Sequence, residues 1–506
     1  MQQAHLILDP HFATGPVNRR LFGSFVEHLG RCVYDGIYEP DHPTADSAGF
    51  REDVLELVRE LGVTTIRYPG GNFVSGFRWE DAIGPKHDRP ARLDLAWHST
   101  ETNHVGIDEF AGWIEKTGSE LMYAVNLGTR GVQEALDVLE YTNIRSGTKL
   151  SDARIANGHI DPYRVKMWCL GNEMDGSWQL GHRSADDYGK IASQTAKAMR
   201  QLDPSIELIV CGSSNAQMTT FGSWEHTVLK HTYDDIDFIS CHAYYEPVDG
   251  DVPSFLASAV NMDRFIESVI ATADAVGAEL KSQKKINISF DEWNVWDSNR
   301  YHGVDKITDI EQWPVAPRLL EDTYSVLDGV VVGNLLISLI KHADRVTAAS
   351  LAQLVNVIAP IMTEPGGATW RQTTFFPFAL TSRLAVGAAL ELNLESNTYE
   401  TKMYGHVNVL DAVATHDPES GATAIFLVNR DLEEPRTVTI DVSRLGPVAI
   451  TETHTLADDD IYAQNTLADQ SRITPAPNHS ASIEDGTLKV TLPAVSWTAI
   501  SLGTQP

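Results

Sequence analysis

Eight short apolar runs alternate with stretches of helical spacing between residues 20 and 351. Several of the runs are rich in β-branched residues, as expected for strands that are buried on both faces. Strict alternation of strand and helix indicates a parallel sheet, and eight such units indicate a (β/α)8 TIM barrel. An open doubly wound sheet is the alternative, but no Gly-rich fingerprint follows the first strand and no P-loop is present. The expected strands are residues 20–26, 63–68, 121–126, 165–170, 206–211, 238–242, 286–291 and 346–351.

The chain changes character beyond about residue 377. With 506 residues it is too long for one ordinary core, so a second domain is expected. Short alternating runs separated by turn-rich segments predict an all-β sandwich, jelly-roll-like, over residues 378–506. The barrel is then residues 16–377, and residues 1–15 contain a strand that we expect to join the sandwich. The expected sandwich strands are residues 407–413, 422–428, 437–442, 448–454, 488–492 and 496–502.

Polar side chains gather where the barrel strands end. Active sites of such barrels lie at the carboxyl ends of the strands, so these residues are expected to surround one pocket. A sugar hydroxyl both donates and accepts hydrogen bonds, which makes a ring of amides, carboxylates and hydroxyls typical of a pocket for a polyhydroxylated ligand. In chain order the strand ends carry Glu27 and His28, Arg67 and Asn72, Asn126, Asn172 and Glu173, Ser213 to Asn215, His242 and Tyr244, Asp291 and Glu292, and Gln353.

Two carboxylates stand out, Glu173 after the fourth strand and Glu292 after the seventh. A pair of facing carboxyl groups is the minimum equipment for glycoside hydrolysis, with one group protonated and the other ionised. Arg67 can hold Glu292 ionised by charge pairing, whereas Glu173, beside Met174 and Trp178, is the better candidate for a raised pKa. Taken alone, either glutamate fits a surface salt bridge, and an isolated Asn172-Glu173 is more often a turn, but two glutamates at equivalent strand ends disfavour these alternatives.

The aromatic and histidine residues of this region leave alternatives open. Trp97 and Trp296 lie in long loops over the expected mouth, where they either stack on a sugar or pack within the loops. His28, His182 and His242 raise the question of a metal site, but no HExxH or comparable spacing is present, so no metal is expected.

The charge and the cysteines limit the possible partners. A formal net charge of −30 argues against nucleic-acid or anionic-membrane partners, which need clustered Lys and Arg. The four cysteines show no metal-type spacing, which favours a reducing compartment. The N-terminus lacks the features of a signal peptide, and the longest apolar run is too short to span a bilayer. A cytoplasmic location is therefore expected.

Five segments, residues 25–28, 67–72, 168–176, 290–294 and 352–356, fall in an order and spacing that resemble glycoside hydrolase family 51. Its principal members are intracellular α-L-arabinofuranosidases. The resemblance implies a retaining enzyme with a (β/α)8 barrel and a C-terminal β-sandwich. It also implies that no cofactor is needed and that the chain assembles as a hexamer.

The resemblance assigns roles residue by residue. Glu173 matches the general acid/base and Glu292 the nucleophile. Arg67 matches a residue that supports the nucleophile, and we expect His242 as a second supporting residue. The positions that hold the sugar hydroxyls are Glu27, Asn72, Asn172, Tyr244 and Gln353, and the pocket aromatics are Trp97 and Trp296.

The function expected from the sequence is removal of terminal arabinofuranose from arabinan or arabinoxylan oligosaccharides by double displacement. The runner-up is a related barrel glycosidase acting on β-xylosides or β-glucans. A carbohydrate-binding protein on an inactive glycosidase scaffold is a third possibility, which the intact Glu173 and Glu292 speak against. The preferred linkage stays open, because the long loops around the pocket decide it.

Overall fold

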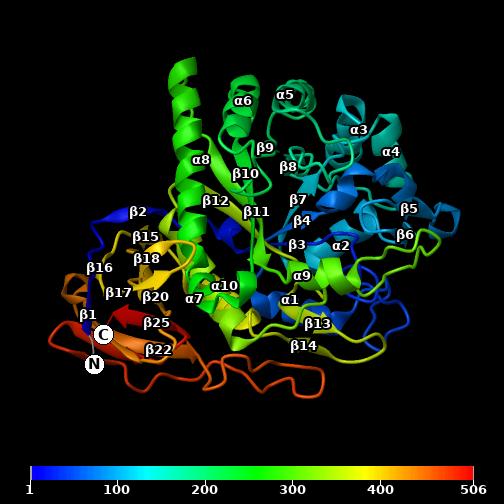
Figure 1. The fold of residues 1–506 in the computed structure, drawn as a ribbon. Helices are drawn as coiled ribbons and strands as arrows, with labels where there is room; N and C mark the ends of the chain where they lie inside the picture. Colours follow the sequence, from blue (N-terminus) through cyan, green and yellow to red (C-terminus); the bar gives the residue numbers. More distant parts are fainter. Residues whose placement is uncertain (1–2, 505–506) are drawn as a thin grey trace.

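The computed structural model describes residues 3–504, and its centre is a closed barrel of eight parallel strands with helices outside it (Figure 1). The predicted barrel is confirmed. It closes where the last strand pairs with the first, with Leu351 opposite Ser24. The barrel strands are β3 (Gly23–Phe25), β4 (Thr65–Tyr68), β7 (Glu120–Ala124), β8 (Met167–Leu170), β9 (Glu207–Val210), β10 (Phe238–Tyr245), β11 (Asn287–Val295) and β12 (Val346–Ala352).

Two differences from the expected strands bear on the site. Residues 20–22 belong to a 3-10 helix (Arg19–Phe22), because Asn18 caps it by accepting a hydrogen bond from the backbone N–H of Arg20. At the other end of the barrel, β10 and β11 run past their expected ends. They therefore place Tyr244 and Glu292 within strands and not on loops.

The helices follow the expected spacing of apolar residues. The helix α1 (Glu52–Leu61) has acidic residues in its first turn and ends at Gly62, whose φ of 76° is the left-handed conformation that glycine adopts without strain. The helix α4 (Lys149–Ala156) was not expected. Within residues 3–504 no helix has the length and apolar character needed to cross a membrane. The other main helices are α2 (Ile107–Thr117), α3 (Val132–Asn143), α5 (Ala185–Leu202), α6 (Ser223–Thr232), α8 (Ser258–Leu280) and α10 (Val326–Lys341).

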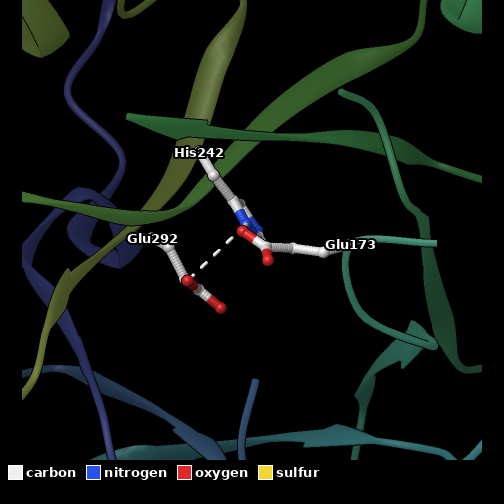
Figure 2. Close-up of side chains that lie close together, drawn as sticks. All are labelled: Glu173, His242 and Glu292. Atoms are coloured by element: carbon white, nitrogen blue, oxygen red, sulfur yellow. Dashed lines mark hydrogen bonds and ion pairs between the residues drawn. The ribbon is translucent and has the colours of Figure 1, made fainter. Parts of the chain in front are cut away.

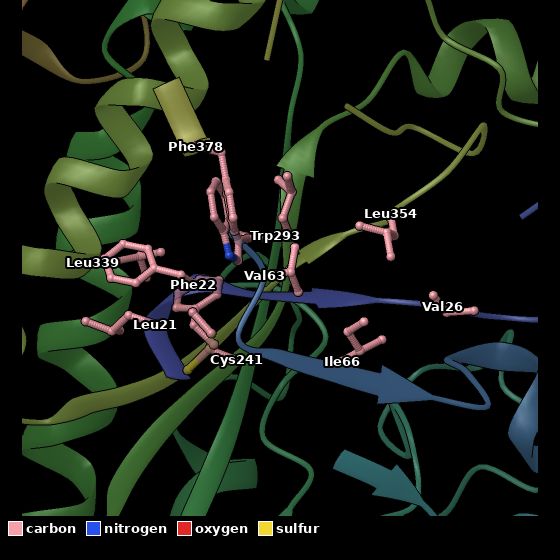
Figure 3. Close-up of a cluster of buried hydrophobic side chains, with 14 of the residues drawn as sticks. Leu21, Phe22, Val26, Val63, Ile66, Cys241, Trp293, Leu339, Leu354 and Phe378 are labelled. Atoms are coloured by element: carbon pink, nitrogen blue, oxygen red, sulfur yellow. The ribbon is translucent and has the colours of Figure 1, made fainter. Parts of the chain in front are cut away.

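Apolar side chains fill the layer between the barrel and its surrounding helices (Figure 3). Phe22 meets the edge of Phe378 with ring centroids 6.4 Å apart. The four cysteines also lie in buried positions, and all four are free.

The C-terminal region forms two antiparallel-rich sheets that face each other across a second apolar core. One expected strand, residues 407–413, is in fact two, β18 (Gly405–Asn408) and β19 (Leu410–His416), because the chain turns at Val409. The first sheet contains β16 (Asn393–Glu395), β1 (Gln3–Ile7), β21 (Arg436–Asp441), β24 (Thr487–Leu492) and β23 (Ser482–Glu484). The second contains β2 (Ala13–Pro16), β15 (Ala388–Leu390), β19, β20 (Thr423–Asn429), β25 (Ser496–Thr504) and β22 (Val448–Leu456).

The N-terminal strand β1 lies between β16 and β21, with His5 opposite Thr439. This pairing supports a division of the chain into residues 1–15 and 378–506 on one side and a barrel of residues 16–377 on the other, which we propose as its domain organisation. The helix α11 (Phe375–Leu384) spans the boundary and packs on both parts.

The helix α10 joins the barrel to the sandwich and is apolar on nearly all sides because both parts cover it. Gly333 is required in it, since a Cβ there would lie 2.3 Å from the indole ring of Trp497. At the same interface the carboxylate of Asp411 accepts hydrogen bonds from Lys341, Asn334 and Arg430. The barrel is therefore held against the sandwich by both apolar packing and a buried ion cluster.

Candidate active site

The two expected carboxylates meet at the carboxyl end of the barrel (Figure 2). Glu173 follows β8 in a backbone with a φ of 42°, a strained left-handed conformation for a residue with a side chain. Glu292 lies within β11, beside His242 of β10. The Nδ1 atom of His242 is 2.9 Å from Glu173 Oε1 and 3.6 Å from Glu292 Oε2. One ligand atom from each of the three residues lies within 4.8 Å of the others.

His242 is fixed from its other side by Asp291, whose Oδ1 lies 2.9 Å from Nε2. Burial lowers the pKa of His242, but the charge of Glu292 and the hydrogen bonds to Asp291 and Glu173 outweigh burial and raise it to about 10. The imidazole therefore carries a proton on both nitrogens at neutral pH.

Glu173, His242 and Glu292 form the one group of His, Cys, Asp and Glu side chains within residues 3–504 that is spaced to hold a metal ion. A doubly protonated imidazole has no lone pair to give to a metal. Both nitrogens of His242 are hydrogen-bonded to carboxyl groups, which suits the group to holding and moving protons.

Glu173 is held in a largely water-free position. Its burial raises its pKa, the hydrogen bond from His242 lowers it, and the charge of Glu292 raises it further. The net shift is upward, as expected from the sequence. The indole Nε1 of Trp178 donates to Glu173 Oε2 over 2.7 Å and fixes the carboxyl group from the solvent side.

Arg67 connects Glu292 to Asn172. Its Nη1 donates to Glu292 Oε1 over 2.6 Å and its Nη2 donates to Asn172 Oδ1 over 2.7 Å. Tyr244 donates its hydroxyl to the other oxygen of Glu292 over 2.8 Å. Because the amide oxygen of Asn172 faces Arg67, its Nδ2 is turned toward Asn72, whose Oδ1 is 3.4 Å away. The guanidinium of Arg67 therefore pairs with the carboxyl group of Glu292 and fixes the orientation of the Asn172 amide.

Glu27 anchors the opposite wall of the site. Its Oε1 accepts hydrogen bonds from the backbone N–H of Phe73 over 2.8 Å and from Trp97 Nε1 over 2.9 Å. Its Oε2 accepts from Gln353 Nε2 over 3.2 Å. Burial raises the pKa of Glu27 to about 8. A Cβ at Gly71 would lie 3.0 Å from Glu292 Oε1, which is tighter than almost all real Cβ contacts, so a larger residue here would press on the carboxyl group of Glu292.

These side chains surround a cavity of about 810 Å3. Arg67, Asn172 and His242 do not line it; they lie beneath the lining residues and hold them. Of the residues expected from the sequence, His28, Asn126 and Ser213 do not line the cavity, whereas the lining contains Glu27, Asn72, Trp97, Glu173, Ser214, Asn215, Tyr244, Glu292, Trp296 and Gln353.

Three residues of the site were not expected. Tyr301 lines the cavity and packs against Trp97 and Trp296, with ring centroids 6.0 Å away in each case. It lies in an irregular helical segment (Tyr301–Asp305), where no periodicity marks it. Gln179 is buried beside Asn172, and it too lies in a segment without regular periodicity. Phe25, whose ring centroid lies 4.9 Å from the guanidinium of Arg67, is the last residue of β3, two residues before Glu27.

Comparison with known proteins agrees with this geometry. The family model "Alpha-L-arabinofuranosidase 1 domain" matches residues 57–254, and "Alpha-L-arabinofuranosidase C-terminal domain" matches residues 291–496. An exo-α-(1→6)-L-arabinofuranosidase of Bifidobacterium longum is 59% identical over 99% of this chain and 97% of its own length. An intracellular exo-α-(1→5)-L-arabinofuranosidase of Streptomyces lividans is 58% identical over 99% of this chain and 75% of its own.

Solved structures agree as well. A family 51 α-L-arabinofuranosidase of Bifidobacterium longum superposes with a TM-score of 0.94 and 50% identity, covering 98% of this chain and 99% of its own. The α-L-arabinofuranosidase of Thermotoga maritima, solved with arabinose, has a TM-score of 0.88 and 34% identity over 98% of this chain and 99% of its own. The resemblance noted in the sequence is confirmed: the chain belongs to the family 51 α-L-arabinofuranosidases.

Proposed function

We propose that this chain is an exo-acting, retaining α-L-arabinofuranosidase that releases terminal L-arabinofuranose from arabinan and arabinoxylan oligosaccharides. The observation that carries the retaining mechanism is the approach of Glu173 and Glu292, whose ligand atoms lie within 4.8 Å of each other around His242. Retaining glycosidases place their two carboxyl groups about 5–5.5 Å apart, whereas inverting ones leave roughly 6.5–9.5 Å for a water.

The balance of buried charge supports separate roles for the two glutamates. Arg67 and His242 are the buried cations beside the two glutamates, and their proximity lowers the pKa of Asp291 against the effect of burial. Two cations are matched by two ionised carboxylates, Asp291 and Glu292. A third buried negative charge would be unpaired, which favours a protonated Glu173. Glu173 is therefore the acid and Glu292 the nucleophile.

The reaction then proceeds in two displacements. Glu292 attacks the anomeric carbon while Glu173 gives its proton to the departing glycosidic oxygen, which leaves an arabinofuranosyl ester on Glu292. Glu173, now ionised, takes a proton from a water that attacks the same carbon and releases Glu292. His242 donates to Glu173 Oε1 and stabilises the ionised form between the two steps.

The walls of the cavity support recognition of one terminal sugar. We assign the sugar hydroxyls to Glu27, Asn72, Asn172, Tyr244 and Gln353. Asn172 does not itself line the cavity, but Arg67 occupies its oxygen and turns its Nδ2 toward the lining residue Asn72, and from that side we expect it to donate to a sugar hydroxyl. Trp97, Trp296 and Tyr301 form an aromatic wall beside them.

The names of the relatives support arabinan fragments as substrates and an intracellular location, which we propose for this chain as well. Related proteins are named for both α-(1→5) and α-(1→6) linkages. A panel of oligosaccharides with single defined linkages, followed by product analysis, measures which one this chain prefers. The hexameric assembly stays a prediction, which light scattering of the purified protein tests.

The mechanism is tested by the configuration of the first product. Proton NMR during hydrolysis of an aryl α-L-arabinofuranoside should show α-arabinofuranose before mutarotation, and Glu292→Ala should form no covalent intermediate. A β-configured first product contradicts the proposal. A β-xyloside or β-glucoside hydrolysed as fast as the arabinofuranoside favours the related glycosidase, and full activity of Glu292→Ala removes the nucleophile assignment.

A further inference from the structure

Two residues in the wall of the cavity have a strained backbone. Leu320 and Ile358 both line the cavity and are buried, with φ angles of 52° and 39°. The left-handed region disfavours any residue with a Cβ and is a genuine outlier for a β-branched one such as Ile358. The two residues are tied together, since the backbone N–H of Ile358 donates to the carbonyl of Leu320 over 2.7 Å. Strain of this kind persists only where the surroundings hold it in place.

The group that holds Ile358 from the barrel side is Asn294. Its side chain is buried, and its Nδ2 donates to the carbonyl of Ile358 over 2.5 Å and to that of Ala352 over 2.6 Å. Its Oδ1 accepts the backbone N–H of Val295 over 2.8 Å. One planar amide thus uses both of its N–H groups on two carbonyls of the same loop. Asn294 does not line the cavity.

The segment between these two carbonyls carries a residue of the sugar pocket. Gln353 follows Ala352 directly, and it contacts Glu27 twice: its Oε1 accepts the backbone N–H of Glu27 over 3.3 Å and its Nε2 donates to the carboxyl group. The loop that starts at Ala352 and ends at Ile358 therefore presents two lining residues, and Asn294 bonds both of its ends to β11, the strand that carries Glu292.

We propose that Asn294 is a positioning residue, which holds Ile358 in its strained conformation and thereby keeps Gln353 and Ile358 in the wall of the sugar pocket. Only a primary amide on this stem serves: Asp has no N–H to donate when ionised, Ser has one donor, and Gln is longer by a methylene. Without the amide, the relaxation of Ile358 toward negative φ moves the loop and weakens contacts made equally in the bound state and the transition state. The inference rests on the proposed function for its readout in catalysis.

The kinetic test uses Asn294→Ala and an aryl α-L-arabinofuranoside. Loss of uniform binding raises KM with little change in kcat, so we expect KM to rise about tenfold and kcat to stay within about threefold. Asn429→Ala is the matched control, because this buried amide also donates to backbone carbonyls, those of Glu434 and Pro493, but within the sandwich. It should lower the melting temperature and leave KM unchanged.

A double-mutant cycle separates the strain from general damage. We call the two hydrogen bonds from Asn294 to the carbonyls of Ala352 and Ile358 the clamp. Glycine adopts a φ of 39° without penalty, so in the Ile358→Gly background the clamp no longer holds a strained residue in place. We expect Asn294→Ala to raise KM less than about threefold there. An equal rise of KM in both backgrounds overturns the proposal, and so does an unchanged KM in folded Asn294→Ala. If Asn294→Ala does not fold, Asn294→Leu, which has a similar shape and no donor, replaces it in the same cycle.

A second readout does not depend on the substrate. Amide hydrogen exchange of residues 353–358 should become faster in Asn294→Ala and stay unchanged in Asn429→Ala. Unchanged exchange overturns the clamp even if the enzyme is active. Faster exchange in Asn294→Ala, combined with a wild-type protein that hydrolyses no arabinofuranoside, supports the role of Asn294 and overturns the proposed function. The two failures are therefore distinguishable.

Discussion

Arg67 and Glu292 form an ion pair, with Nη1 2.6 Å from Oε1, in which both side chains are almost completely shielded from solvent. The pair sits at the bottom of the cavity and shares its guanidinium with Asn172. A charge in this position acts in a medium of low dielectric constant, where it stabilises a carboxylate far more than it would in water. The fork of the guanidinium also fixes geometry, which a point charge does not.

Arg67→Lys separates these two effects. A lysine keeps a positive charge near Glu292, but it lacks the rigid planar fork with which the guanidinium donates to Glu292 and Asn172 at the same time. We expect kcat/KM for an aryl arabinofuranoside to fall about 10²-fold in Arg67→Lys, and further in Arg67→Ala, which leaves the buried carboxylates without a partner. Equal activities of the two variants would mean that the charge of Arg67 is irrelevant. Circular dichroism of each variant checks that the barrel is folded.

Glu173→Ala tests the acid role through the leaving group. A glycoside with a poor leaving group needs the proton of Glu173, whereas an acidic phenol departs without it. We expect kcat/KM to fall by about 10²–10⁴ for an alkyl arabinofuranoside and by much less for a dinitrophenyl one. Equal losses for both substrates would contradict the assignment. Steady-state kinetics on the two glycosides measures this difference, with wild type as the reference for each.

His242→Gln tests the contact between His242 and Glu173 by pH. His242, whose pKa is raised to about 10, is charged throughout the working range and lowers the pKa of Glu173. Glutamine can donate a hydrogen bond but carries no charge, so the pKa of Glu173 should rise. The alkaline limb of the kcat/KM profile is then expected to move to higher pH. His226→Gln, at an exposed ion pair with Glu279, should leave the profile unchanged; a shift toward lower pH in His242→Gln would refute the coupling.

Glu134 predicts a pH-dependent stability outside the site. It is buried with its Oε2 unpartnered, and burial raises its pKa to about 8. A carboxyl group with a raised folded-state pKa contributes stability that is complete below its unfolded pKa of 4.5 and is lost as the pH rises through 8. Glu134→Gln should therefore melt close to wild type at pH 5 and several degrees above it at pH 9.

Glu115→Gln, at an exposed position, is the control for this measurement and should show the same difference from wild type at both pH values. Differential scanning calorimetry at pH 5 and pH 9 provides the data. A difference for Glu134→Gln that shrinks toward high pH would show that the buried carboxyl group does not carry the effect.

The barrel and the main site residues were predictable because both depend on local pattern. Runs of buried β-branched residues mark the strands, and the rule that function lies at their carboxyl ends selects Glu173 and Glu292 without any knowledge of distances. Tyr301 and Asn294 escaped prediction for opposite reasons. Tyr301 lies in an irregular segment with no period to read, while Asn294 lies in an expected motif but acts only through carbonyls of Ala352 and Ile358, far away in sequence.

The position of β1 has a consequence for the synthesis of the chain. This strand leaves the ribosome before the barrel, yet its neighbours β16 and β21 follow the barrel in the sequence, so it has no partner while the barrel is being made. The barrel can fold from contiguous units as they emerge, since domains fold largely as they are synthesised. The sheet that contains β1 can form only after β21 has been made. A ribosome that stalls between the barrel and β16 therefore leaves a barrel with β1 unpaired along both of its edges, and these edges are the part of such an intermediate most exposed to aggregation.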